Sequence, residues 1–204
     1  MATWTKKDFD AAGVTEYPAG PALDQLRRNF GGSVVLALDV SGSMAGKRIE
    51  KAVRGCRRFI CEAVEANYSV GLILWNHGIS GSVPVDYDPS AAYRLLAQAD
   101  IAGANNVVPC LELAHRMLLD ARASDMVLAV FGDGDLGDPR EASRVAAKLT
   151  ADGIRILTCG LGQSSAESLA IISTETSTTR VAETNTIVDS IADMACGLRF
   201  LSRP

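Results

Sequence analysis

Short apolar runs, bounded by glycine, proline or polar residues, predict the buried strands of this chain. Four of these runs, rich in aliphatic and β-branched residues, lie at 33–39, 69–75, 126–131 and 154–160. Because apolar residues fill consecutive positions, we expect both faces of these strands to be covered, as in a parallel sheet. The run at 79–85 contains Pro84, which favours an antiparallel edge strand joined by a hairpin. Residues 178–182 predict a weak further strand.

Between the strands, apolar residues recur every three or four positions, which is the spacing of amphipathic helices. Helices are predicted at 47–66, 88–99, 108–121, 138–151, 166–174 and 187–199. This alternation predicts an α/β fold: a doubly wound, mostly parallel central sheet with one antiparallel edge strand and helices on both faces. We expect one domain over residues 31–204. Residues 1–30, mixed in character and interrupted by glycine and proline, are expected to form a lead-in that packs on it.

Composition and charge exclude several classes of protein. The chain has 204 residues, of which 48% are hydrophobic and 22% charged, and this balance is typical of a globular protein. A net charge of −4 gives no reason to expect nucleic acid or a membrane surface as a partner. The sequence lacks a secretory signal pattern, so we expect a cytoplasmic protein. The five cysteines show no C-x-x-C spacing and are interpreted as small core residues of a reduced protein.

The segment 39–44 carries the most specific chemistry in the sequence. Asp39, Ser41 and Ser43 follow the first buried run directly and are spaced by two residues. Their carboxylate and hydroxyl oxygens are the hard ligands that Mg²⁺, Ca²⁺ or Mn²⁺ prefer. The alternative is that Asp39 caps a turn and the serines only begin a helix.

Two later loops carry further oxygen ligands. Asn105 and Asn106 precede the helix predicted at 108–121, and Asp133 follows the strand predicted at 126–131. In an open α/β sheet, ligands bind beyond the carboxyl ends of the strands, so we expect Asp39 and Asp133 to face one crevice. Asn105 has an alternative interpretation as a turn residue, and a shift of one residue would replace it by Asn106.

At this point the chain resembles the von Willebrand factor A domain over about residues 33–199. The resemblance rests on D-x-S-x-S at 39–43, on Gly103-Ala104-Asn105, and on Asp133-Gly134 after a buried strand. It implies a Rossmann-like fold with a metal-ion-dependent adhesion site (MIDAS). Ser41 and Ser43 would ligate the ion, while Asp39 and Asp133 would supply charge, mostly through bound water. The family usually has threonine where this chain has Asn105, whose amide oxygen is also an acceptable hard ligand.

The resemblance implies a function in protein binding and not in catalysis. A divalent ion, with Mg²⁺ preferred over Ca²⁺ or Mn²⁺, would keep an open coordination position that attracts an aspartate or glutamate of a partner protein. Bacterial intracellular members of the family often act as adaptors with AAA+ ATPases or in stress-response systems, which we expect here by resemblance alone. The alternatives are a metal-independent scaffold in which Asn105 marks a degraded site, or a metal-dependent hydrolase. Ser41 and Ser43 have no evident base partner and the chain has two histidines, so no enzyme is predicted.

The other polar candidates have simpler explanations. His77 is interpreted as an exposed residue of a polar turn, with a place at the rim of the site as the alternative, and His115 is interpreted as structural. Asp138, directly before Pro139, is expected to cap a helix, and Asp135 to be solvated. The many basic residues of the helix at 47–66 are interpreted as a solvated face, with a docking surface for an acidic partner as the alternative.

Overall fold

The structure of the protein, a computed structural model, describes residues 31–175, 180–183 and 185–201. The strands are β1 (Gly32–Asp39), β2 (Tyr68–Trp75), β3 (Ile79–Asp86), β4 (Asp125–Gly132), β5 (Ile154–Leu161) and β6 (Arg180–Ala182). The helices are α2 (Lys47–Glu65), α3 (Ser90–Ala97), α4 (Val108–Ala121), α5 (Pro139–Ala151), α6 (Gln163–Leu169) and α7 (Ile187–Asp193). Two 3₁₀ helices, η1 (Gly42–Met44) and η3 (Met194–Leu201), complete the described elements. The predicted lead-in lies outside the described residues.

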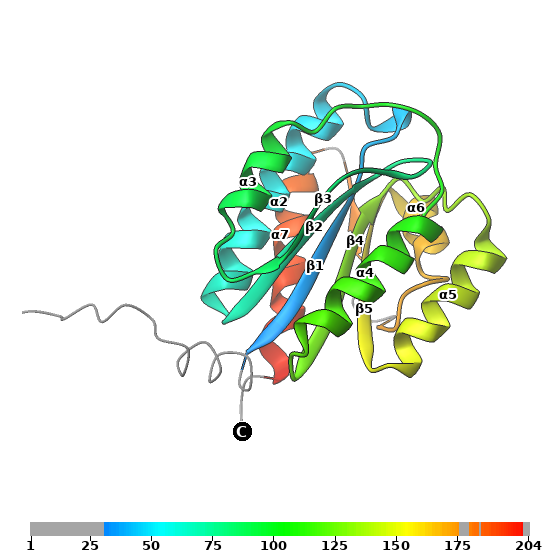
Figure 1. Ribbon diagram of the computed structural model, residues 1–204. Coiled ribbons are helices and arrows are strands. Elements are labelled where there is room, and N and C mark those ends of the chain that lie inside the picture. The colour runs from blue at the N-terminus through cyan, green and yellow to red at the C-terminus, as the bar shows by residue number, and fades with distance from the viewer. Residues whose placement is uncertain (1–30, 176–179, 184, 202–204) are drawn as a thin grey trace, which may run out of the picture.

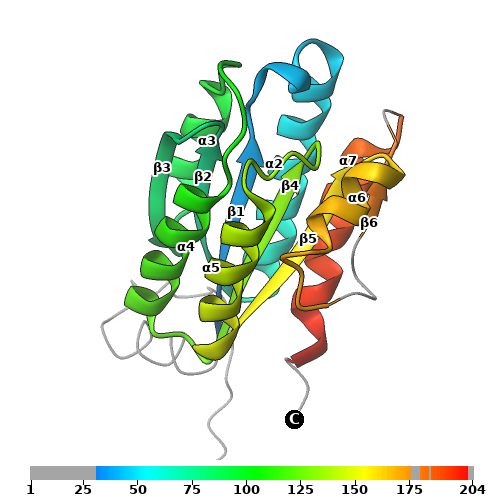
Figure 2. The ribbon, with the colours of Figure 1, turned by 90° about the vertical axis from the view of Figure 1, so that its right-hand side faces the viewer.

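All six described strands form one sheet in the order β3-β2-β1-β4-β5-β6. Figure 2 shows the strands in this order across the molecule. Every neighbouring pair is parallel except β2 and β3, which form the predicted antiparallel hairpin at one edge. At the centre of the sheet, Leu38 of β1 lies opposite Leu74 of β2 on one side and Phe131 of β4 on the other. The fold class predicted from the sequence is therefore confirmed, and β1 is central with β4 beside it.

Helices cover both faces of the sheet, as Figure 1 shows. Successive side chains of a strand point to opposite faces, so each strand contributes to two cores. Val34, Leu36 and Leu38 of β1 pack in the core under α2, α3 and α7. Val35 and Ala37 pack in the core under α4, α5 and α6. All five side chains are fully buried, which explains why β1 is apolar at consecutive positions.

The C-terminal third differs from the prediction in where its helices begin and end. α6 spans Gln163–Leu169 and not 166–174, because residues after it bind the open edge of β5. Thr174 donates its backbone N–H to the carbonyl of Ile156 at 3.0 Å and accepts the Ile156 N–H on its hydroxyl at 2.8 Å. β6 pairs with β5 from Cys159 onward, so the segment around Thr174 forms hydrogen bonds with an earlier part of β5 that β6 does not reach. Of the strand predicted at 178–182, the last three residues form β6, and the first two lie outside the described residues.

The last predicted helix also ends early. α7 stops at Asp193 and the chain continues as η3, whose Gly197 carbonyl accepts a hydrogen bond from Arg155 at 2.9 Å. In the described part of the chain, no helix combines the length and apolar character that crossing a bilayer requires.

Arg155 joins three segments at the end of the sheet opposite the predicted site. Its guanidinium donates to Asp125 of β4 at 2.9 Å and to Glu175 at 2.7 Å. Asp125 also accepts a hydrogen bond from the hydroxyl of Tyr68 at the start of β2. The side chains of Arg155 and Asp125 are 20% and 13% exposed, so this ion pair is largely shielded from water. Together with the Gly197 contact, these bonds attach the C-terminal segment to the sheet.

The cysteines divide into two groups. Cys56, Cys110 and Cys159 are buried among apolar side chains, as predicted. Cys61 and Cys196 are exposed, so the prediction of core positions is wrong for these two. Cys61 lies on the outward side of α2, where its thiol is 3.7 Å from a carboxylate oxygen of Glu65 one turn further on.

Candidate functional site

Three loops bring the predicted site residues together at the carboxyl edge of the sheet. Asp39 is the last residue of β1, and the turn that follows it carries Ser41 and Ser43 around η1. Asn105 lies in the loop before α4, and Asp133 follows β4 directly. Because β1 and β4 are parallel neighbours, their carboxyl ends place these groups side by side. Asp39 and Asp133, which were expected to lie close together, are in contact: the backbone N–H of Asp133 donates to the carboxylate of Asp39 at 3.3 Å.

The two carboxylates share one hydrogen-bond network. Asp39 accepts from the backbone N–H of Ser41 at 2.8 Å and from that of Asp133 at 3.3 Å. The side-chain amide of Asn105 donates to Asp133 at 2.8 Å and to Asp39 at 3.4 Å. The hydroxyl of Ser43 donates to Asp133 and lies 3.0 Å from the hydroxyl of Ser41. All five predicted ligands therefore belong to one cluster of polar side chains.

Backbone hydrogen bonds hold the three loops in place. The N–H of Gly42 donates to the carbonyl of Gly103 at 3.2 Å, and the N–H of Ala102 donates to the carbonyl of Val40 at 3.0 Å. Val107 donates to the carbonyl of Leu136 at 3.2 Å, so the second loop is also bonded to the third. These bonds belong to the main chain, so the positions of the loops do not depend on the site side chains.

Gly132, the last residue of β4, permits the close approach of Asp39. A Cβ atom at position 132 would lie 3.1 Å from a carboxylate oxygen of Asp39 and 3.3 Å from the indole of Trp75. Any side chain there would push against the carboxylate. Glycine at position 132, which the sequence prediction did not single out, thus lets Asp39 pack closely against the end of β4.

Burial makes Asp39 a weaker acid than a solvent-exposed aspartate. Its residue is completely buried, with an exposed fraction of 0%. Burial raises the pKa of Asp39 from 3.8 to about 6; the negative charge of Asp133 adds to this effect, and hydrogen bonds from Ser41 oppose it. A cation beside Asp39 would remove the cost of its buried charge.

The raised pKa of Asp39 predicts that the metal-free protein becomes more stable as the pH falls from 7 to 5. The folded state holds a proton on Asp39 below about pH 6, while the unfolded chain takes it up only near pH 3.8. Over this range the free energy of unfolding gains about 1 kcal/mol from this group, and the gain levels off below pH 3.8. Urea unfolding in the presence of a chelator measures it.

The matched control for this measurement is Asp39→Asn, which has no titrating group at position 39. The difference in free energy of unfolding between the native protein and this variant should change by about 1 kcal/mol between pH 7 and 5. A constant difference would show that Asp39 is ionised throughout that range.

The donor set fits a hard divalent cation and not a soft one. It consists of two hydroxyls, two carboxylates and one amide, the groups that Mg²⁺, Ca²⁺ and Mn²⁺ prefer. Across the described ranges, no group of three or more His, Cys, Asp or Glu side chains could hold a metal ion. The amide nitrogen of Asn105 faces the carboxylates, and turning the amide over would present its oxygen instead.

The remaining sequence candidates near the cluster have roles in the backbone. Asn106 is not part of it: its side-chain oxygen accepts from the N–H of Val108 at 3.2 Å in the turn that leads into α4. Asp138 caps α5, as predicted, by accepting from the N–H groups of Arg140 and Glu141 at 3.0 and 3.2 Å.

The side chains of Asp135 and of the two histidines are not members of the cluster, although the backbone N–H of Asp135 donates to the carboxylate of Asp133 at 3.2 Å. Asp135 is exposed and accepts a hydrogen bond from the backbone of Gly137 at 3.0 Å. His77 is exposed beside the second loop, where a Cβ on Gly103 would come within 2.7 Å of its ring. His115 pairs with Asp152 at 2.7 Å, between α4 and α5, which agrees with a structural role.

Sequence reasoning missed the contribution of Arg48. Its guanidinium donates to the backbone carbonyl of Ser43 at 3.0 Å, so a side chain of α2 supports the loop that carries both serines. The available signal was the concentration of basic residues at the very start of a helix, where positive charge is unfavourable. The interpretation as a solvated face is incomplete at this end of α2.

Comparisons with known proteins identify the family and the fold. The family model of the von Willebrand factor type A domain matches residues 34–135, which is half of the chain. No curated protein matched the sequence. Among solved structures, the vWF domain of the type V pili tip protein Mfa5 from Porphyromonas gingivalis has a TM-score of 0.76 at 11% identity and covers 86% of this chain and 97% of its own.

Two further solved structures show the same architecture. The conserved hypothetical protein BatB from Bacteroides thetaiotaomicron has a TM-score of 0.64 at 20% identity, covering 81% of this chain and 100% of its own. The pilus adhesin SpaC from Lactobacillus rhamnosus GG has a TM-score of 0.70 at 13% identity, covering 83% of this chain and 30% of its own. At these identities the likeness concerns the fold alone, whereas the family match covers β1, the first two loops and the start of the third. The chain belongs to the von Willebrand factor type A domain family.

Proposed function

We propose that this protein is a metal-ion-dependent protein-interaction module. Ser41, Ser43 and Asn105 would hold a divalent cation, Mg²⁺ in the first place, with Asp39 and Asp133 beside it. The cation would bind an aspartate or glutamate side chain of a partner protein. The observation that carries this proposal is the convergence of these five polar side chains from three loops on one hydrogen-bond network.

The chemistry of the cluster explains why an external carboxylate would be attracted. Its hydroxyl and amide ligands are neutral, and its carboxylates already accept hydrogen bonds from the surrounding loops. A divalent ion held mainly by neutral ligands keeps much of its positive charge and completes its coordination with an outside oxygen. Ser43 is exposed while Asp39 is completely buried, so the open side of such a site faces solvent at Ser43.

A metal-independent scaffold is the second candidate, and one contact favours it. The side-chain amide of Asn105 donates hydrogen bonds to the carboxylates of Asp39 and Asp133. Its N–H groups therefore lie where a cation would have to bind. The hydrolase alternative finds less support, because His115 is committed to Asp152 on the outer helices and not to a serine of the site. We also propose a cytoplasmic adaptor role beside an AAA+ ATPase or a stress-response component, on the family resemblance alone.

Thermal unfolding with and without Mg²⁺ tests the proposed function. For a dissociation constant of about 1 mM, 10 mM Mg²⁺ should stabilise the folded state by about 1.4 kcal/mol, which raises Tm by roughly 4 °C. Asp39→Ala and Ser43→Ala should each abolish the rise. Ser43→Ala changes an exposed side chain and keeps the fold intact, so its result stands even if Asp39→Ala is unstable.

Asp120→Ala is the matched control, because Asp120 is an exposed carboxylate on α4. It should respond to Mg²⁺ as the native protein does. An identical Tm with chelator and with 10 mM Mg²⁺, Ca²⁺ or Mn²⁺ would refute the metal site and leave the scaffold. A pull-down with and without the ion then tests whether partner binding depends on it.

A further inference from the structure

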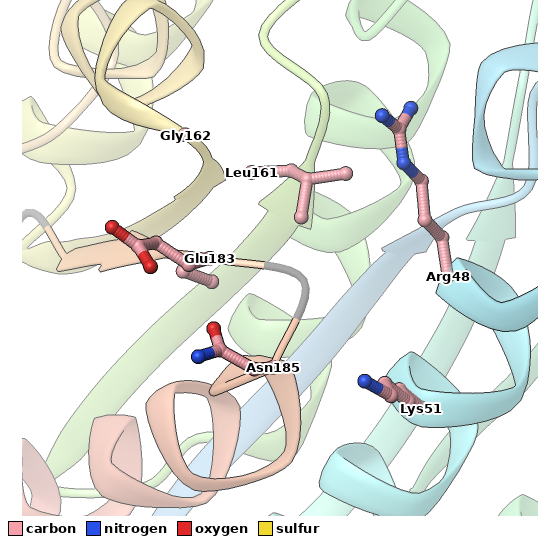
Figure 3. Close-up of a pocket in the computed structure, with 7 residues that line it drawn as sticks. Arg48, Lys51, Leu161, Gly162, Glu183 and Asn185 are labelled. Atoms are coloured by element: carbon pink, nitrogen blue, oxygen red, sulfur yellow. The ribbon is translucent and has the colours of Figure 1, made fainter.

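A second pocket opens beside the candidate metal site. It has a volume of about 620 Å³ and lies between the start of α2 and the connections that follow β5 and β6. Figure 3 shows its walls: Arg48 and Lys51 extend from α2 on one side, and Glu183 and Asn185 lie on the other. The backbone at its base is fixed, because the N–H of Gly162 donates to the carbonyl of Ala182 at 2.8 Å.

The walls of this pocket carry a net positive charge. Two cations from α2 face one carboxylate, that of Glu183, and one neutral amide, that of Asn185. Arg48 and Glu183 are exposed, so an incoming group can reach both, and the half-buried Lys51 lines the same pocket. Guanidinium, ammonium and amide N–H groups together form a donor set that suits a carboxylate.

The pocket and the candidate metal site lie on the same edge of the molecule and are linked by a hydrogen bond from Arg48. Leu161, Ala182 and Asp39 end their strands at the carboxyl edge of the parallel part of the sheet. Arg48 lines the pocket and donates to the carbonyl of Ser43 at 3.0 Å, while the hydroxyl of Ser43 belongs to the candidate metal cluster. A single extended chain lying on this edge would therefore meet both places.

The charges at the start of α2 reduce the stability of that helix. Lys47, Arg48 and Lys51 outnumber Glu50, the acidic residue of the same first turns, at the end of the helix where the dipole disfavours positive charge. α5 in the same chain begins with an acidic N-cap, Asp138, has Glu141 beside Arg140 in its first turn, and has a lysine in its last turn. The excess of positive charge at the start of α2, where α5 has an acidic cap, is consistent with a binding role for these basic side chains.

We propose that the pocket binds a second carboxylate of the same acidic partner segment whose first carboxylate binds the cation. Arg48 and Lys51 hold this second group, and Glu183 limits the strength of the contact. The inference rests on the proposed function, and it narrows the partner from any protein with an accessible aspartate or glutamate to one with at least two acidic residues in an extended stretch.

Fluorescence anisotropy with two labelled peptides tests this inference. One peptide has ten glutamates, and the other has one glutamate among nine glutamines; each spans roughly 33 Å when extended. At low ionic strength and 10 mM Mg²⁺, the ten-glutamate peptide should bind about a hundredfold more tightly than the single-glutamate peptide, because its ten carboxylates give a statistical factor of about ten and the pocket should contribute a further factor of about ten. Arg48→Gln/Lys51→Gln should reduce this ratio to about ten, the factor that follows from the number of carboxylates alone. Glu183→Gln should increase the ratio.

Arg116→Gln/Lys148→Gln is the matched control, because it removes two positive charges from exposed positions on α4 and α5. It should keep the affinity ratio of the native protein. Equal ratios in the pocket variant and in this control would overturn the inference. Failure of the proposed function would give a different result: the affinity of each peptide would be the same in Mg²⁺ as in chelator.

Discussion

Replacing Arg155 by methionine should lower the free energy of unfolding by about 3 kcal/mol. The guanidinium makes three hydrogen bonds, to Asp125, Glu175 and the carbonyl of Gly197, and its side chain is only 20% exposed. Methionine keeps the apolar stem but leaves a 13% exposed Asp125 carboxylate without its counter-charge. Removing one partner of a largely buried ion pair is costly because the other charge stays desolvated. Urea unfolding should show the loss, and calorimetry a Tm lower by roughly 10 °C.

The control for this measurement is Arg144→Met. Arg144 also pairs with a carboxylate, Glu141, but both side chains lie on the solvent side of α5, 59% and 37% exposed. Exposed pairs of this kind contribute little, so we expect no measurable change in Tm. Equal effects of the two substitutions would show that the Arg155 network does not hold the C-terminal segment to the sheet.

The sheet could be predicted from the sequence because its signal is local. Each central strand is a run of consecutive apolar residues, and Val34 to Leu38 alternate between two cores that both exclude water. The edge strand β3 differs visibly, since its side chains alternate between exposed and half-buried positions and include Pro84. Burial on two faces, on one face, or at an edge thus leaves a distinct pattern in the sequence.

The ends of the last helices could not be predicted because distant contacts decide them. Thr174 looks like the end of a helix in the sequence, yet it binds Ile156 at the part of β5 that β6 does not reach. Gly197 likewise gives its carbonyl to Arg155, which lies in β5. Such contacts depend on the lengths of strands that are neighbours only in space, and periodicity along the chain contains no information about them.

The site was predictable in its composition but not in its contacts. The spacing of Asp39, Ser41 and Ser43 at the end of a buried strand was enough to predict one loop, and topology placed Asp133 beside it. The direction of the Asn105 amide depends on two carboxylates from other loops, so no local pattern reveals it. Arg48 was missed for the same reason, because its acceptor is a backbone carbonyl outside its helix.

The Asn105 amide is the feature on which the metal-dependent and metal-independent functions differ most. Without a cation, its N–H groups are what separates the charges of Asp39 and Asp133. With a cation, the ion itself would do so, and the amide oxygen would become a ligand. Asn105→Asp therefore has opposite effects in the two states, since it removes the donors and adds a third carboxylate.

We expect Asn105→Asp to lower the free energy of unfolding in chelator by about 3 kcal/mol, because two charge-assisted hydrogen bonds are lost and like charges are brought together. In 10 mM Mg²⁺ most of this loss should be recovered, with an ion affinity at least about tenfold above that of the native protein. Asn105→Ala separates the two causes: it loses the donors, adds no charge, and should gain no affinity. Full stability of Asn105→Asp in chelator would contradict the bridging role of the amide. If Mg²⁺ does not restore the stability of Asn105→Asp, then even three carboxylates on these loops do not bind a cation. The native site, which has two carboxylates, would then function without a metal ion.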